Sequence, residues 1–197
     1  MKQMLLLIPI VGILGFTLIA FKPAAVTHKV DLKQSSMSWT GHKVTGKHSG
    51  LINLKSGELK FDGPKLVGGS FEIDITSISC SDLSGEYADK LIGHLKSDDF
   101  FGAAKYPTAK LVITNAAAQG PGLYKITGDL TLKGTTKPIR FLATVKDENG
   151  MKTANAEIKI DRVDFNIKYG SGSFFEDLGD KTIYDEFDLN VKLVTKK

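Results

Sequence analysis

The sequence contains very little cysteine, because Cys80 stands alone among 197 residues. A single thiol excludes an internal disulfide and excludes a metal cluster held by several thiolates. The chain must therefore be stabilised by a hydrophobic core, and 42% of its residues are hydrophobic. The roughly 170 residues that follow residues 1–25 are enough for one domain that buries about 70% of its unfolded surface.

A strong charge of one sign is also missing. The whole chain has 26 basic and 22 acidic residues. Residues 1–25 contain Lys2 and Lys22 and no acid, so the remainder carries a net charge of only about +2. No basic cluster with interleaved aromatic residues follows, as tracking a phosphate backbone would require. We expect no nucleic-acid partner.

Catalytic motifs are absent as well. The glycines of Gly170-Ser171-Gly172 are not followed by Gly-Lys-Ser/Thr, so this stretch is not a phosphate-binding loop. The acid pairs Asp98-Asp99 and Glu176-Asp177 have no nucleophilic partner nearby in the sequence, and general acid–base catalysis needs a perturbed carboxyl group in a cleft. We expect a protein that is not an enzyme and that needs no cofactor.

The N-terminal segment contains the one long apolar run. Met4 to Phe21 is apolar apart from Thr17, follows Lys2 and precedes the small residues Ala24 and Ala25. This arrangement is typical of a secretory signal. A helix of this length would span about 27 Å, so a retained membrane anchor is the alternative. Residues 1–25 are thus predicted to be a signal peptide or membrane anchor, and the domain to be exported, in the periplasm or elsewhere outside the cytoplasm.

The rest of the chain is dominated by alternation with a period of two, the signature of strands with one buried face. Apolar residues alternate with polar ones in runs centred on Met37–Trp39, 71–75, 111–113, 124–132, 139–145, 154–160 and 183–193. Turn sequences separate them at 119–122, 134–138 and 147–150, the last ending in Asn-Gly. Between Ile160 and Val163 the parity flips, which predicts a bulge or a barrel corner.

One segment has helical periodicity instead. Ala88, Leu91, Ile92 and Leu95 follow a spacing of three and four residues after Ser84, a candidate N-cap. A single helix among eight or more strands predicts a cap or plug on a closed sheet, since closure removes exposed edges. The predicted fold class is all-β, an antiparallel barrel of about eight strands with one helix between strands. A barrel of this size is either filled by side chains or holds one small ligand.

Five blocks, taken together, resemble the YceI family. They are WTGHKVTGKHSG (39–50), GGSFEIDITSI (68–78), KLIGHLKSDDFFGAAKYPTA (90–109), ITGDLTLKGTTKPIRF (126–141) and DRVDFNIKYGSGSFFEDLGDK (161–181). They occur in family order, and the resemblance covers residues 28–195. It implies a lipocalin-like barrel in the bacterial periplasm that sequesters or carries a polyisoprenoid or other long-chain lipid in an apolar tunnel without catalysis. It also suggests a homodimer, and residues 4–21 would allow membrane association.

Eleven residues are candidates for contact with such a ligand. Phe71, Ile73, Phe165 and Tyr169 are predicted to point inward by strand parity. Phe100 and Phe101 follow the predicted helix as a flap at the tunnel mouth, and Phe174 and Phe175 are predicted to line or close that mouth. The full set is Trp39, His48, Phe71, Ile73, Leu91, Phe100, Phe101, Phe165, Tyr169, Phe174 and Phe175. Each of them has core packing or a structural turn as its alternative role.

Two other functions stay open on the sequence. His42, His48 and His94 provide the three imidazoles of an open metal site, so a metal-dependent enzyme is one alternative. The spacing does not favour it, because Gly46 interrupts the ladder between His42 and His48. The other alternative is an interaction or stress-response protein whose barrel is filled.

Overall fold

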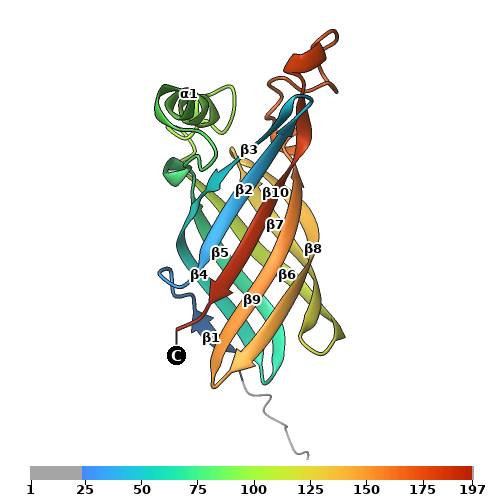
Figure 1. Ribbon diagram of the computed structural model, residues 1–197. Helices are drawn as coiled ribbons and strands as arrows, with labels where there is room; N and C mark the ends of the chain where they lie inside the picture. Colours follow the sequence, from blue (N-terminus) through green and yellow to red (C-terminus); the bar gives the residue numbers. More distant parts are fainter. Residues whose placement is uncertain (1–23, 197) are drawn as a thin grey trace, which may run out of the picture.

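The computed structural model describes residues 24–196 and contains one curled antiparallel sheet with a single α-helix at one end (Figure 1). Residues 1–23 of the predicted signal or anchor segment, 1–25, lie outside the described residues. Within residues 24–196, no helix has the length and hydropathy needed to cross a bilayer. The elements are β1 (Val26–Lys29), β2 (Ser36–Lys43), β3 (Gly46–Leu51), β4 (Asn53–Asp62), β5 (Lys65–Asp74), η1 (Ile75–Ser77), α1 (Gly85–Lys96), β6 (Thr108–Gly120), β7 (Leu123–Leu132), β8 (Thr135–Glu148), β9 (Met151–Asp161), η2 (Val163–Phe165), η3 (Gly179–Lys181) and β10 (Ile183–Val194).

The sheet closes into a barrel through its two terminal segments. Its strand order is β1-β4-β5-β6-β7-β8-β9-β10-β2-β3, with neighbours antiparallel. β10 pairs with β2. Thr195, the residue after β10, forms an antiparallel bridge with Val30, the residue after β1. β1 and β2 lie end to end beside β10 and together fill one position in the barrel wall. β4 pairs with β1 and β3 pairs with β2, so β3 and β4 together fill the next position. The ten strands therefore occupy eight positions around the barrel. The predicted all-β barrel of about eight strands is confirmed.

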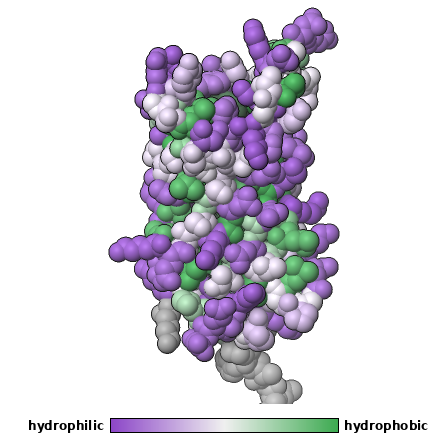
Figure 2. Space-filling view, in the orientation of Figure 1, coloured by the Kyte–Doolittle hydropathy of each residue, from purple (hydrophilic) through white to green (hydrophobic). Residues whose placement is uncertain are grey.

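Alternation decides which side chains face the interior. Along β7, Tyr124, Ile126, Leu130 and Leu132 are buried while Lys125 and Asp129 are exposed. The other strands follow the same rule, and the face of the molecule shown in Figure 2 is mainly hydrophilic with scattered apolar residues. The interior therefore contains one continuous apolar core, as expected for strands with one wet face.

One of the predicted turns forms as expected, and another is shorter than predicted. The hairpin at Asp147–Gly150 forms as expected, with Asn149 and Gly150 at positive φ between β8 and β9. The turn predicted over 134–138 is limited to Lys133 and Gly134, and Pro138 lies within β8. β8 pairs with β9 only from Ala143 onward. The first half of β8 thus has one edge that is not paired with β9. Pro138 is tolerated there because proline has no N–H to donate to a neighbouring strand.

The parity flip after Ile160 marks a chain that leaves the sheet. β9 ends at Asp161, Arg162 follows, and the short helix η2 begins at Val163. η2 packs against β8, and Asn166 donates a hydrogen bond to the Thr135 hydroxyl. The expected barrel corner is therefore the start of an excursion, residues 162–182, that returns as β10.

The predicted helix is α1, which lies at the end of the barrel opposite the N-terminal strand β1 (Figure 1). Ser84 is at its N-cap position, although its side chain makes no capping hydrogen bond. Leu91 and Ile92 pack against the core, and Leu95 is buried. The apolar stripe of the helix thus faces the barrel, as the periodicity predicts.

At the opposite end the barrel is filled. Tyr124 accepts a hydrogen bond from the Leu66 amide, and its hydroxyl donates to the Pro64 carbonyl. Lys152 is buried there, pairs with Asp147 and lies over the Phe61 ring. Entry through this end would require these contacts to break.

Candidate ligand-binding cavity

An apolar cavity of about 220 Å³ remains inside the barrel. Its walls come from β2 to β10 and from α1, and nearly all of them are aliphatic or aromatic side chains. The lining residues run along β10 from Ile183 to Leu193. At about 3.3 Å per residue this is roughly 33 Å of strand. The cavity is therefore elongated along the barrel, and the barrel interior is not completely filled.

Seven of the predicted ligand contacts border this cavity. Trp39 does so from β2, with its indole N–H donating to the Ser79 carbonyl oxygen at 3.1 Å. Phe100 and Phe101 border it from the segment after α1, and their rings meet edge to face at 5.2 Å. The seven are Trp39, His48, Phe71, Ile73, Leu91, Phe100 and Phe101. Their contact with a ligand stays a prediction, but the structure brings them to one surface.

The other four candidates do not border the cavity. Phe165 is buried in η2, outside the lining. Tyr169 was expected to point inward, and this is wrong: the chain there is not a strand, and the side chain is 48% exposed with its ring against His94. Phe174 and Phe175 are about half exposed on the excursion, and Lys168 lies over the Phe174 ring at 4.3 Å. They are not part of the cavity wall.

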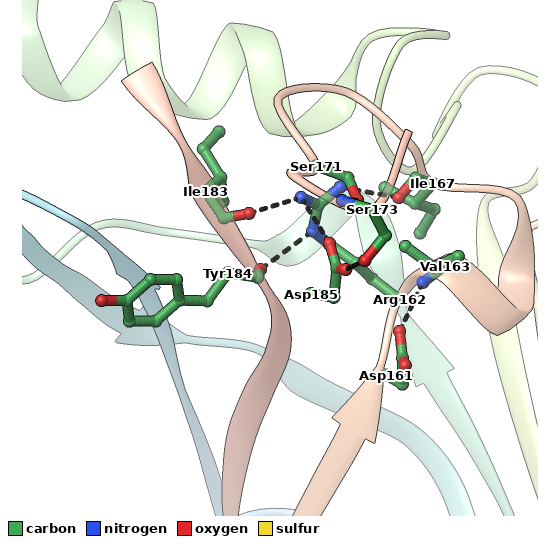
Figure 3. A network of polar contacts seen from close by, with 9 residues as sticks. All are labelled: Asp161, Arg162, Val163, Ile167, Ser171, Ser173, Ile183, Tyr184 and Asp185. Carbon is green, nitrogen blue, oxygen red and sulfur yellow. Dashed lines mark hydrogen bonds and ion pairs between the residues drawn. The ribbon is translucent and has the colours of Figure 1, made fainter. Parts of the chain in front are cut away.

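Arg162 fixes that excursion to the barrel, and the sequence did not single it out as a site residue. Its side chain is only 2% exposed. The guanidinium donates to the carbonyl oxygens of Ile167, Ile183 and Tyr184 and contacts Asp185 at 3.4 Å (Figure 3). Burial lowers the pKa of Arg162, although the negative charges of Asp185 and Asp161 oppose this shift. An arginine remains charged in a protein. The buried positive charge of Arg162 is therefore compensated by three carbonyl oxygens and by the carboxylate of Asp185.

Arg162 also helps to close the α1 end of the cavity. Its guanidinium lies 5.5 Å from the centre of the Phe100 ring, a cation–π distance. The signal in the sequence was a single basic residue at the point where strand parity flips, between Ile160 and Val163. Its carbonyl partners are distant in sequence or belong to irregular backbone, which strand periodicity does not describe.

The three histidines of the alternative metal site are not brought together. Gly41 pairs with His48 across β2 and β3, so the neighbouring His42 points to the opposite face of the sheet. His42 pairs on the outside with Asp188 at 2.7 Å, and His48 pairs with Asp82 at 2.8 Å. Among residues 24–196 no group of three His, Cys, Asp or Glu side chains has a metal-binding arrangement. The three-histidine site expected as an alternative does not form.

The comparisons with known proteins agree with this architecture. Residues 28–195 match the model of the YceI-like domain. The chain belongs to the YceI-like family. A UPF0312 protein of Pseudomonas putida is 33% identical over 147 residues, which cover 72% of this chain and 70% of that protein. A UPF0312 protein of Shewanella denitrificans is 43% identical over 94 residues, covering 48% of this chain and 47% of that protein.

Solved structures of YceI-like proteins have the same fold. The crystal structure of Burkholderia cenocepacia BcnA superposes with a TM-score of 0.70 at 27% identity and covers 85% of this chain and 99% of its own. A structure described as a polyisoprenoid binding domain from Saccharophagus degradans gives a TM-score of 0.64 at 14% identity, covering 86% and 97%. The second likeness supports the barrel fold and no more.

Proposed function

We propose that this YceI-like protein is a non-catalytic binding protein that holds a polyisoprenoid or another long-chain amphiphile in its barrel. The observation that carries the proposal is the elongated apolar cavity, open inside an otherwise well-packed core. The described polyisoprenoid binding of the Saccharophagus domain, on the same fold, supports the ligand class.

The lining explains why a long chain would bind. Transfer of each methylene from water to an apolar wall contributes about 0.8 kcal/mol, so a chain of about ten carbons offsets the loss of freedom on binding. Such a wall discriminates weakly between tails that differ by one methylene. The cavity therefore favours long apolar chains as a class and does not single out one compound.

Trp39 provides a direct test, because it is the sole tryptophan and borders the cavity. The purified protein should release a stoichiometric lipid into an organic extract, identified by mass spectrometry. After delipidation, added isoprenoid alcohols should change the Trp39 fluorescence with saturation. Extracts without lipid, together with unchanged fluorescence, would contradict the proposal.

A pair of variants connects binding to the cavity. Ala143 borders the cavity, and its neighbour Thr144 is exposed on the outside of β8. Ala143→Leu adds three carbons to the interior and should displace about three ligand methylenes, which weakens binding by ~2.4 kcal/mol, or roughly 50-fold. Thr144→Leu is the matched control and should bind as the unmodified protein does. Equal affinities for both variants would place the ligand elsewhere.

Export and assembly belong to the same proposal. We propose that residues 1–25 direct the chain out of the cytoplasm, where a lipid carrier would meet membrane-derived ligands. The mass of the mature N-terminus distinguishes a cleaved signal from a retained anchor. A homodimer stays a prediction, to be measured by light scattering of the purified domain.

A further inference from the structure

The cavity has one polar end. Several polar side chains border it near α1, the β2–β3 hairpin and the start of β10, whereas the part of its wall nearest Tyr124 consists of apolar side chains such as Leu59, Leu66 and Val145. The polar side chains on the inner side at the α1 end are Lys43, His48, His94 and Arg162. An amphiphile would therefore bind with its headgroup beneath α1 and its tail toward Tyr124.

The buried polar groups at this end are already paired, with one exception. Arg162 uses its donors on three carbonyls and Asp185, and His48 is bound to Asp82. His94 differs: its Nε2 atom is buried and has no hydrogen-bond partner among residues 24–196. Buried polar atoms in native proteins are nearly always satisfied, so an unpaired one beside a cavity points to a bound partner.

The His94 ring is held in place by its neighbours. It lies in the last turn of α1, with Tyr169 edge to face at 4.3 Å and Phe100 at 5.7 Å. The Arg162 guanidinium in turn lies over the Phe100 ring. A ring fixed by aromatic contacts keeps its nitrogen in one position, which suits it to orient a ligand.

We propose that His94 Nε2 hydrogen-bonds an uncharged oxygen, a hydroxyl or carbonyl, in the headgroup of the bound amphiphile. This inference rests on the proposed function, because it assigns the headgroup end of the same cavity. One imidazole nitrogen makes one hydrogen bond, whereas a buried carboxylate or phosphate needs a cation or several donors. The nearest buried cation, Arg162, is already balanced by Asp185 and three carbonyl oxygens.

The test uses three ligands with one tail: hexadecan-1-ol, hexadecane and hexadecanoate, delivered from cyclodextrin and followed by Trp39 fluorescence. The unmodified protein should prefer the alcohol to the hydrocarbon by about tenfold, equivalent to about 1.4 kcal/mol. His94→Phe keeps a ring between Phe100 and Tyr169 but has no polar atom. It should abolish this preference and leave hexadecane binding unchanged.

The control variant is His28→Gln, because His28 lies on β1 at the opposite end of the barrel and does not border the cavity. It should keep the preference for the alcohol. A preference that survives in His94→Phe, or that is lost in His28→Gln, would overturn the assignment. Tighter binding of hexadecanoate than of the alcohol would overturn the uncharged headgroup.

The outcomes also separate this inference from the function on which it rests. An unmodified protein that binds none of the three ligands contradicts the proposed function. One that binds alcohol and hydrocarbon equally, with no change in His94→Phe, retains the function and shows that water satisfies His94. If His94→Phe does not fold, the ¹⁵N chemical shift of His94 Nε2 in the unmodified protein tests the hydrogen bond instead. Addition of hexadecan-1-ol should change this shift, and addition of hexadecane should leave it unchanged.

Discussion

Arg162 shows how one residue can organise an irregular segment. A buried cation is costly unless its donors are used. Here they bind the Ile167 carbonyl within the excursion and the carbonyls of Ile183 and Tyr184 at the start of β10. Ser173 adds to the network by donating to Asp185, the carboxylate that faces Arg162 (Figure 3). The side chain thus replaces the strand pairing that β9 loses after Asp161.

Replacement of Arg162 by Met should therefore destabilise the protein by at least about 3 kcal/mol, because the carboxylate of Asp185 and three carbonyls lose their partner. The free energy of unfolding in urea measures this loss. Arg140→Met is the matched control, since Arg140 is exposed on β8, and it should change stability by no more than about 0.5 kcal/mol. Equal effects of the two substitutions would show that the Arg162 contacts add nothing.

At the scale of elements, the segment 79–82 is an unusual feature because it lies directly on β3 without being a strand. The Ser79 amide donates to Leu51, the Ser81 amide to Ser49, and Asp82 accepts from the Ser49 amide. Gly50 makes this approach feasible, since a Cβ there would lie 1.7 Å from the Ser79 oxygen. The segment holds Trp39 on one side and leads into α1 on the other.

Asp82 should make the attachment of this segment depend on pH. Burial raises its pKa, but hydrogen bonds from the Ser49 amide, His48 and Cys80 outweigh this and lower it from 3.8 to about 2. A lowered folded-state pKa means that the carboxylate stabilises the fold above pH ~4, and that this contribution disappears as the pH falls to ~2.

Asp82→Asn should accordingly be less stable than the unmodified protein at pH 6, with the difference narrowing toward pH 2. Urea unfolding followed by Trp39 fluorescence measures both proteins at each pH. A difference of the same size at both pH values would contradict the assigned role of the carboxylate.

At the scale of the whole molecule, closure depends on the two ends of the described chain. The Asp31 amide donates to Val194, and the Lys196 amide donates to Lys29, both at 2.7 Å. Thr195 is fully buried at this junction, where its hydroxyl accepts from the Lys152 amide and its own amide donates to the Lys152 carbonyl. These contacts join β1, β9 and β10 at the filled end of the barrel.

Thr195→Val keeps the shape of the side chain and removes this acceptor, leaving a buried amide unpaired. It should cost about 1–3 kcal/mol of stability. Thr144→Val, at an exposed position of β8, is the control and should be nearly neutral. Thermal and urea unfolding compare the two variants, and a neutral Thr195→Val would mean that closure does not depend on this hydroxyl.

Much of the fold could be predicted from the sequence, because strand alternation and helical spacing are local properties. Met37, Phe71 and Ile126 face the interior as their parity indicated, and Leu91 and Leu95 lie on the inner face of α1. The candidate site was predicted in part. Residues on regular strands, on α1 or in the segment just after α1 reach the cavity. Phe165, Tyr169, Phe174 and Phe175 lie in the excursion, where strand parity does not apply.

The sequence by itself determined the strands, the single helix, the Asn-Gly hairpin and membership of the YceI-like family, since each depends on short-range pattern or on blocks in order. Only the tertiary structure decided how the barrel closes through Val30 and Thr195, and that Arg162 is buried. It also decided that His42 and His48 separate onto two faces while His94 keeps an unpaired nitrogen at the cavity. These features depend on contacts between residues far apart in the chain, whose geometry no local periodicity encodes.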